Sequence, residues 1–294
     1  MNAIEIRNLS KSFRGLYAVD GLNMTVPVGS IYGFIGENGS GKSTTEKLIC
    51  GHLVPDGGEI RLFGKDYSDA GVRARVGALI ESAGCFPNSG VWANLMMQAL
   101  NLGIKNRGEE IDRVLKIVRM EDSAKIKFKS CSLGMKQRIG IAMALLGDPA
   151  LLILDEPING LDTDGMRIMR EVLIDITKNY QCTVVISSHI LGELEKIATH
   201  YGIVRGGKMV KEMTAEELNA DCRTFVALQT KEMEKTLALL ERRYSRVALE
   251  NGYIRVYDGV KAEEVASYLF NELNIAVTEI TTDKIGLEDT ISTL

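Results

Sequence analysis

A glycine-rich segment near the start of the chain has the residue types that can hold a chain of phosphates. Residues 36–44 read Gly-Glu-Asn-Gly-Ser-Gly-Lys-Ser-Thr, after the apolar run 31–35 and before a helical pattern. This is the pattern G-x-x-x-x-G-K-S in a strand-loop-helix setting, which is typical of phosphate-binding loops. The four fixed positions coincide by chance in roughly one chain in a hundred of this length, so a fortuitous glycine turn is a poor alternative.

Different residue types of this loop are expected to contact different parts of a bound nucleotide. Gly36, Gly39 and Gly41 allow positive φ angles, so successive backbone N–H groups can face phosphate oxygens at the start of a helix. Lys42 supplies a positive charge for the β- and γ-phosphates. The whole loop is expected to bind the nucleotide, including a Thr44 hydroxyl that can donate to the α-phosphate, and its other members are Glu37, Asn38, Ser40 and Ser43.

A pair of acidic residues follows the apolar run 151–154. Side chains at the carboxyl end of a parallel strand face the crevice in which phosphates bind. Asp155 is therefore expected to hold Mg²⁺ together with the hard oxygen of Ser43, and Glu156 to orient or deprotonate the attacking water. Acidic residues that merely open a helix are the ordinary alternative, but the phosphate-binding loop makes the functional interpretation the better one.

A third polar strand end is predicted where the apolar run 183–186 gives way to Ser187, Ser188 and His189. It belongs to the same predicted sheet edge as Asp155. The His189 ring can donate a hydrogen bond to the γ-phosphate. Together with Lys42 and Glu156, this histidine completes the expected catalytic set.

The order of apolar runs and helical periods predicts an α/β fold with a mostly parallel sheet. Residues 81–149 show helical patterns only, so they are expected to form a helical subdomain inserted between two strands. The expected strands of the sheet are 31–35, 75–80, 151–155 and 183–187, and helices are expected after Lys42 and at 91–102, 109–118, 133–146 and 164–178.

The pattern changes after about residue 214, where the order β-α-β-β-α-β predicts a small α+β domain of ferredoxin-like type over residues 215–294. The expected strands are 223–229, 247–250, 253–257 and 276–280, and the expected helices are 232–242 and 262–273. Residues 1–214 are then the nucleotide-binding domain.

Composition excludes several other classes of protein. Of the 294 residues, 45% are hydrophobic and 25% charged, a balance that excludes a disordered chain. No apolar stretch reaches the ~20 residues that cross a bilayer, and no secretory signal opens the chain, so a cytoplasmic location is expected. The five cysteines form no C-x-x-C pair, which disfavours a zinc site. Acidic residues outnumber basic ones after position 214, by 15 to nine, which argues against nucleic acid as a partner.

With these motifs in this order, residues 1–214 resemble the ATP-binding subunit of ABC transporters. Residues 131–137 read Cys-Ser-Leu-Gly-Met-Lys-Gln, where family members carry the L-S-G-G-Q signature, and they stand between the phosphate-binding loop and the acidic strand. Residues 159–162 resemble the family's D-loop, which ends here in Asp162. Phe13 resembles the aromatic residue that stacks on adenine, and Tyr17 is the alternative for that role.

The resemblance implies an ATPase that energises a separate integral-membrane permease, on the inner face of the cell membrane. It also implies an ATP-dependent homodimer, in which each ATP lies between the phosphate-binding loop of one copy and Ser132 and Gly134 of the other. Leu133 and Met135 depart from the signature, where the family has a Gly and a Gln. The two replacements affect how strongly the signature of one copy can contact the γ-phosphate held by the other.

A second departure concerns the Q-loop, where this chain has Glu81 instead of the usual glutamine. A carboxylate can ligate Mg²⁺ as an amide does, but it cannot donate a hydrogen bond when ionised. Glu81 is therefore expected at both the nucleotide and the metal. A glutamate at this position resembles the subset of these ATPases associated with export of, or immunity to, peptide antibiotics such as bacitracin and lantibiotics. Peptides or other small amphipathic compounds are therefore the expected cargo.

Two other functions are weighed against this one. A soluble ABC-type ATPase with a role in translation, repair or assembly is disfavoured, because the chain has one phosphate-binding loop and no sustained heptads. A P-loop kinase or GTPase is disfavoured because no guanine-reading N-K-x-D is present and the signature would have no role.

Overall fold

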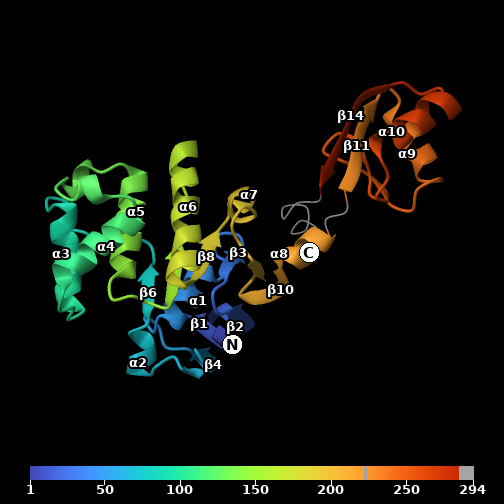
Figure 1. Cartoon of the computed structure of the whole chain (residues 1–294). Helices are drawn as coiled ribbons and strands as arrows, with labels where there is room; N and C mark the ends of the chain where they lie inside the picture. The colour runs from blue at the N-terminus through green and yellow to red at the C-terminus, as the bar shows by residue number, and fades with distance from the viewer. Residues whose placement is uncertain (222–223, 285–294) are drawn as a thin grey trace. The chain divides into compact units, whose positions relative to one another are not determined.

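The computed structural model describes residues 1–221 and 224–284, which belong to two compact units divided after Ala215 (Figure 1). The first unit is built on a six-stranded sheet whose strands are parallel except at the β10 edge. β3 and β8 are buried along their whole length, as expected for the inner strands of a parallel sheet covered on both faces. In spatial order the strands are β10 (Lys208–Thr214), β9 (His200–Arg205), β3 (Ile31–Ile35), β8 (Thr183–Ser188), β7 (Leu151–Asp155) and β6 (Val76–Leu79).

Four strands of this sheet are those predicted from the sequence, each within one residue at either end. The α/β fold class is thereby confirmed. β9 and β10 were not predicted, and β10 alternates between exposed and half-buried residues along most of its length, so it lacks the continuous apolar run of the inner strands. The longest helix of the first unit, α6 (Thr163–Tyr180), and α1 (Lys42–Ile49) follow the two strand ends that carry the predicted site, while α2 (Ala70–Arg73) and α7 (Leu191–Leu194) are short.

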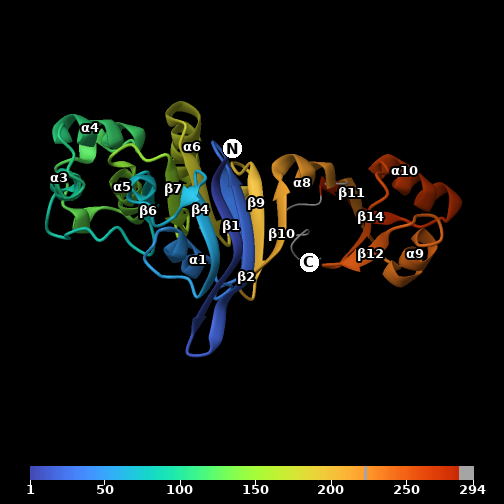
Figure 2. The ribbon, with the colours of Figure 1, turned by 90° about the horizontal axis from the view of Figure 1, so that it is seen from below.

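A second, antiparallel sheet lies in the first unit and was not predicted. Figure 2 shows β4, β1 and β2 side by side. Its long strands are half-buried and interrupted by register shifts, which breaks the regular alternation that marks a strand in a sequence. One apolar core joins both sheets and α1 through residues such as Leu22, Phe34 and Leu48. The strands are β1 (Asn2–Phe13), β2 (Leu16–Pro27), β4 (Gly57–Leu62) and β5 (Lys65–Asp66).

Between β6 and β7 the described chain is helical, as the sequence predicts for residues 81–149. Three helices group together beside β6 (Figure 1). They are α3 (Val91–Asn101), α4 (Arg107–Ile117) and α5 (Leu133–Leu145), with 3-10 turns at Glu121–Ser123 and Phe128–Ser130.

The second unit has a four-stranded antiparallel sheet in the order β12-β13-β11-β14. With the chain order β-α-β-β-α-β, this is the ferredoxin-like arrangement. Its own apolar core includes Val226, Leu240 and Leu269. After the leading helix α8 (Ala215–Asp221), the elements are β11 (Thr224–Thr230), α9 (Met233–Leu240), β12 (Val247–Glu250), β13 (Tyr253–Val256), α10 (Ala262–Ser267) with a π turn at Tyr268–Glu272, and β14 (Val277–Lys284).

The strand ends of this unit differ modestly from those predicted. β14 continues to Lys284 instead of ending at Ile280, because its polar outer residues still pair with β11. Arg223, the predicted start of the first strand, lies outside the described residues, as does Cys222. The four cysteines that the structure describes are free thiols. No helix within residues 1–221 and 224–284 has the length and apolar character to cross a membrane.

Candidate nucleotide-binding site

The phosphate-binding loop joins the end of β3 to the start of α1, as predicted. Gly39 and Gly41 have φ angles of 81° and 104°, a region that only glycine adopts at little cost. Gly41 is also the N-cap of α1. The prediction of a positive φ at Gly36 is wrong, since Gly36 is not among the positive-φ residues. Glycine is required there for space, because a Cβ would lie 2.5 Å from the carbonyl oxygen of Val204.

The Lys42 side chain is held at the loop by backbone carbonyls. Its Nζ donates to the carbonyl oxygens of Gly36 at 2.6 Å and Glu37 at 3.0 Å, and only 6% of the residue is exposed. A buried, oriented ammonium group of this kind presents a fixed positive charge to an anion in the loop. Ser40 is equally buried, and its Oγ has no hydrogen-bond partner among the described residues. Both groups are available to a bound phosphate.

The acidic strand end lies beside this loop. Ser43 Oγ donates to Asp155 Oδ2 at 3.2 Å, so two of the three predicted metal ligands are together in the free protein. They are hard oxygen donors, the type that Mg²⁺ takes from a protein while it keeps waters and binds nucleotide phosphates. The described residues contain no cluster of three His, Cys, Asp or Glu side chains that could hold a metal alone. The donor set therefore fits a Mg²⁺ ion that also binds phosphate.

Glu156 and His189 meet at the same edge of the sheet. His189 Nδ1 lies 2.8 Å from Glu156 Oε2, which brings the two predicted catalytic side chains together. Glu156 has a φ of 50°, an uncommon conformation for a residue with a side chain. Its N–H is fixed by Ser187, through the carbonyl oxygen at 3.1 Å and Oγ at 3.2 Å. The backbone therefore turns sharply where the carboxylate leaves the strand.

Ser187 joins these groups, and it was not predicted as a site residue. Its Oγ donates to Asp155 Oδ1 at 2.7 Å while it accepts from the Glu156 N–H. The serine is fully buried at the end of β8, hydrogen-bonded in register opposite Asp155 of β7. A polar residue that closes a buried strand next to an acidic one was the available signal.

The signature and the D-loop contact each other within one copy. Ser132 is the N-cap of α5 and accepts from the Met135 N–H at 3.3 Å. The nearest outside atom to a Cβ on Gly134 would be Leu161 Cδ2 at 3.6 Å, in the D-loop. Asp162 caps α6 by accepting from the Gly165 N–H.

Glu81 is engaged by a lysine and not by the other predicted metal ligands. Its Oε1 lies 2.5 Å from Nζ of Lys47 on α1, while 70% of the Glu81 side chain is exposed. The hydrogen bond and charge of Lys47 lower the pKa of the Glu81 carboxyl, so Glu81 is ionised at neutral pH. It has a φ of 65°, which marks a sharp turn after β6. Metal binding by Glu81 would compete with this ion pair for the negative charge of the carboxylate.

The two aromatic candidates for adenine stacking are exposed on the β1–β2 hairpin. Phe13 is 46% and Tyr17 63% exposed. The hairpin approaches the loop, because the carbonyl oxygen of Ala18 lies 2.3 Å from the position of a Cβ on Gly41. Lys11 Nζ is 5.7 Å from the centre of the Phe13 ring. Both rings therefore remain open to a planar ligand.

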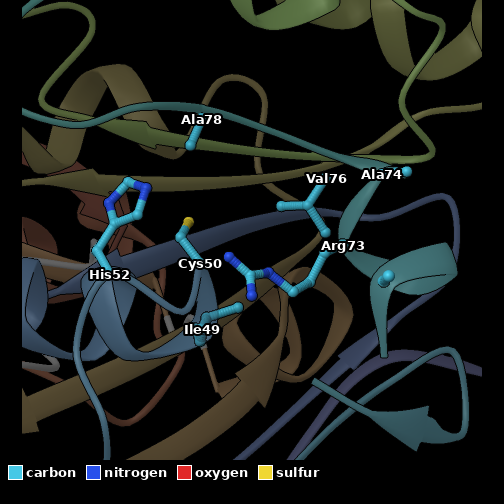
Figure 3. Close-up of a pocket in the computed structure, with 8 residues that line it drawn as sticks. Ile49, Cys50, His52, Arg73, Ala74, Val76 and Ala78 are labelled. Atoms are coloured by element: carbon cyan, nitrogen blue, oxygen red, sulfur yellow. The ribbon is translucent and has the colours of Figure 1, made fainter. Parts of the chain in front are cut away.

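A groove opens where α1 ends. One cavity of about 520 Å³ lies among α1, α2 and β6, and Figure 3 shows the Arg73 guanidinium directed toward Cys50 in it. A second cavity of about 240 Å³ shares four of its lining residues and continues past Ser82 toward α3 and α5. The groove thus runs from the phosphate-loop helix to the helical subdomain and passes the residue after Glu81.

Comparison with known proteins gives a consistent assignment. Residues 19–159 match the family model described as ABC transporter. The bacitracin transport ATP-binding protein BcrA of Bacillus licheniformis is 38% identical over 97% of this chain and 95% of its own. The lantibiotic transport ATP-binding protein SrtF of Streptococcus pyogenes is 38% identical over 71% of this chain and 90% of its own.

A solved structure agrees with these relatives. CbiO1 from Clostridium perfringens, described as part of the ABC transporter complex cbiONQ, matches with a TM-score of 0.68 and 26% identity over 82% of this chain and 96% of its own. The chain therefore belongs to the ABC transporter family, in which it is an ATP-binding protein and an ATPase.

Proposed function

We propose that this ATPase powers the export of peptide antibiotics, or of similar small amphipathic compounds, through a separate integral-membrane permease, at whose cytoplasmic side it acts. The observation that carries the ATPase part is the junction of Lys42, Ser43, Asp155, Glu156 and His189 at one sheet edge. The cargo is supported by the relatives named for bacitracin and lantibiotic transport and by the carboxylate at position 81.

Each residue of this site has a separate role in ATP hydrolysis. Lys42 holds the β- and γ-phosphates by charge, and Ser43 and Asp155 hold a Mg²⁺ ion. Bound Mg²⁺ would neutralise the charge that develops on the phosphates. Glu156 Oε accepts a hydrogen bond or a proton from the attacking water, and the neighbouring His189 ring donates to a γ-phosphate oxygen.

A second copy of the chain completes the site in this proposal. Ser132 and Gly134 begin α5, where backbone N–H groups and the positive end of the helix dipole favour an anion. Within one copy Ser132 is exposed and Gly134 is half-buried, so both are accessible to the nucleotide of a partner. Two ATP molecules then lie between two copies, and hydrolysis allows the copies to separate.

The permease is proposed to contact the groove beside Glu81. The groove combines an apolar floor with the Arg73 guanidinium, so a helical segment of the permease that carries an acidic residue fits it. Phe86, 54% exposed, extends the contact surface at the loop 85–87. Arg73→Glu is expected to abolish co-purification with the permease but to leave basal ATP hydrolysis unchanged, whereas retained co-purification would contradict this contact.

The catalytic assignment is tested by Glu156→Gln. The amide cannot accept a proton from water, so the rate of phosphate release is expected to fall about 10²- to 10⁴-fold. ATP binding should stay within about threefold, because Glu156 does not hold the phosphates. A variant that hydrolyses ATP at the normal rate would remove Glu156 from this role.

The cargo is tested in cells that produce the chain together with its permease. Resistance to bacitracin or to a lantibiotic is expected to rise with the wild-type chain and not with Glu156→Gln. Equal sensitivity in both strains to every peptide tried would exclude these peptides as cargo while leaving the ATPase assignment intact.

A further inference from the structure

The end of β1, which carries Phe13, extends past the neighbouring strand β4. The pairing of β1 with β4 ends at Ser10 and Gly57. Among the described strands, residues 11–13 therefore pair only with β2, on their other side. Asp56 is the residue immediately before β4, so it lies next to the edge of β1 that β4 leaves open.

Asp56 makes hydrogen bonds to three consecutive residues of β1. Its N–H donates to the Ser10 carbonyl oxygen at 2.9 Å. Its Oδ1 accepts from Lys11 Nζ at 2.6 Å, and its Oδ2 accepts from the N–H and the Oγ of Ser12 at 2.7 and 2.8 Å. The Asp56 carboxylate therefore supplies the partner that β4 would otherwise give to the backbone immediately before Phe13.

The charge of this carboxylate also fixes a cation beside the Phe13 ring. The hydrogen bonds from Lys11 and Ser12 lower the pKa of Asp56 to about 2, so the carboxylate is ionised at neutral pH. Lys11 Nζ, which it holds, lies 5.7 Å from the centre of the Phe13 ring, within the range of a cation–π contact. The Phe13 residue is still 46% exposed, so a planar base can approach the ring.

Asp56 lies on the segment that continues from the phosphate-binding loop. The chain passes from α1 through residues 50–55 to Asp56. Leu48 of α1, Leu53 of the following segment and Leu9 of β1 pack in one apolar core. A ring that is held through Asp56 is therefore fixed relative to the loop in which the phosphates bind.

We propose that Asp56 is a positioning residue of the nucleotide site, which holds the end of β1 so that the Phe13 ring is preorganised to stack on the adenine base. Asp56 touches neither base nor phosphate in this role. Without its carboxylate, the end of β1 must be ordered when the base binds, which weakens binding. The proposal rests on the proposed function, because it assumes that ATP binds with its adenine on Phe13 and not on Tyr17.

The test separates the binding of adenosine from the binding of phosphates. For each variant of the full chain, the Kd of ADP and the Kd of pyrophosphate are measured by calorimetric titration in the same buffer. The ratio of the pyrophosphate Kd to the ADP Kd is the adenosine effect. Because base stacking on an aromatic ring strengthens binding by about 5- to 150-fold, Phe13→Ala should lower the adenosine effect by that factor.

Asp56→Ala is expected to lower the adenosine effect by at least about fivefold, and by no more than Phe13→Ala does. The Kd of pyrophosphate should stay within about twofold of the wild type, because Asp56 does not hold the phosphates. The variant is expected to fold, since the Asp56 side chain is 40% exposed. In Asp56→Asn the amide oxygen still accepts from the Ser12 N–H, so the adenosine effect should stay within about twofold of the wild type.

The double variant with Phe13→Ala and Asp56→Ala distinguishes positioning from general damage. If Asp56 acts through the ring, its substitution should change the adenosine effect by less than about twofold once Phe13 is absent, because residues that act as a unit are not additive.

Asp66→Ala is the matched control. Asp66 lies on β5, at the edge of the same antiparallel sheet, and accepts from the Ser68 N–H at 2.9 Å and from the Ser68 hydroxyl. Its loss therefore removes the same kind of Asp–Ser contact from a strand that pairs with β4 and not with β1. The adenosine effect of Asp66→Ala should equal that of the wild type.

The proposal is overturned if Asp56→Ala keeps the full adenosine effect, if Asp66→Ala lowers it equally, or if the losses of the two single variants multiply in the double variant. If Phe13→Ala keeps the full adenosine effect, the base does not stack on Phe13, and the proposal fails while the phosphate site stands. Failure of the proposed function gives a different result, because the wild-type chain would then bind neither ADP nor pyrophosphate.

Discussion

The two units of the chain differ in how many of their buried polar side chains lack a hydrogen-bond partner. Among the described residues, buried side-chain oxygens without a hydrogen-bond partner occur at Ser40, Glu46 and Glu156 in the first unit, where Glu156 Oε2 has only the contact with the His189 ring, and only at Tyr244 in the second. The three residues of the first unit all lie at the phosphate-binding loop, its helix or the acidic strand end. A folded protein rarely leaves such groups unpaired unless a ligand or a reaction uses them.

The second unit instead pairs its polar groups with one another. On its sheet, the hydroxyls of Tyr253 and Tyr257 donate to Glu279 at 3.1 Å and Glu250 at 2.7 Å. The Arg255 guanidinium also donates to Glu250 and lies 4.7 Å from the Phe225 ring centre. These polar side chains on the sheet therefore have hydrogen-bond or ion-pair partners within the unit. We therefore propose that the first unit carries the chemistry and that the second unit is an accessory domain.

The largest effect is expected from Lys42→Ala. Loss of a buried ammonium group that faces the phosphates should weaken ATP binding by about 30- to 4,000-fold, since truncating a buried charged partner costs about 2–5 kcal/mol. Lys235→Ala in the second unit removes an exposed ion pair with Glu232 and should change the Kd less than twofold. If the two variants changed the Kd measured by ATP titration equally, the claim that the first unit binds the nucleotide through Lys42 would be wrong.

The next largest difference between the two units is expected from alanine substitutions at glycines with positive φ angles. Gly41→Ala places a Cβ 2.3 Å from the Ala18 carbonyl oxygen at a φ of 104°, so the backbone must shift, at about 3 kcal/mol or more. Gly259→Ala has a similar φ of 69° but nothing within 4 Å, and should cost only about 1–2 kcal/mol. Calorimetric unfolding and ATP binding measure both, and unchanged ATP binding in Gly41→Ala would contradict the close approach of β2 to the loop.

A smaller effect is expected from Lys47→Gln. An exposed ion pair is weak, so its loss should free Glu81 and lower the half-saturating Mg²⁺ concentration for ATP hydrolysis by up to about fivefold. Lys116→Gln on α4 is the exposed-lysine control. A half-saturating concentration that stays the same or rises would indicate that Glu81 does not bind the metal.

The smallest effect is expected from removal of the second unit. A chain that ends after Asp221 keeps the whole first unit and α8. Its ATP hydrolysis per site is expected to stay within about threefold of the full chain, because the described catalytic groups all lie before residue 190. A larger loss of phosphate release, with the fold intact by circular dichroism, would give the second unit a regulatory role.

The sequence predicted the parts of the fold that repeat a clear pattern. The continuous apolar runs of β3 and β7 were found to the residue, because inner parallel strands are buried on both faces. The irregular β1 and β2 were missed, since their register shifts break the alternation. β10 was missed because half-buried residues obscure its pattern.

The candidate site could be predicted where residue type and spacing define the chemistry. Gly41, Lys42 and Asp155 lie as expected. Glu46 and Ser187 were missed because their complete burial depends on tertiary neighbours. Glu46 did carry a signal, since it occupies a position between the buried Thr45 and Leu48 on the core face of α1.

The most direct test of the account is the mass of the Glu156→Gln variant in the presence of ATP and Mg²⁺. With turnover blocked, light scattering should show twice the monomer mass with ATP and the monomer mass when nucleotide is omitted, and a separate nucleotide determination should find two ATP molecules per dimer. A saturated variant that remains monomeric would contradict the claim that two copies of this chain enclose the nucleotide.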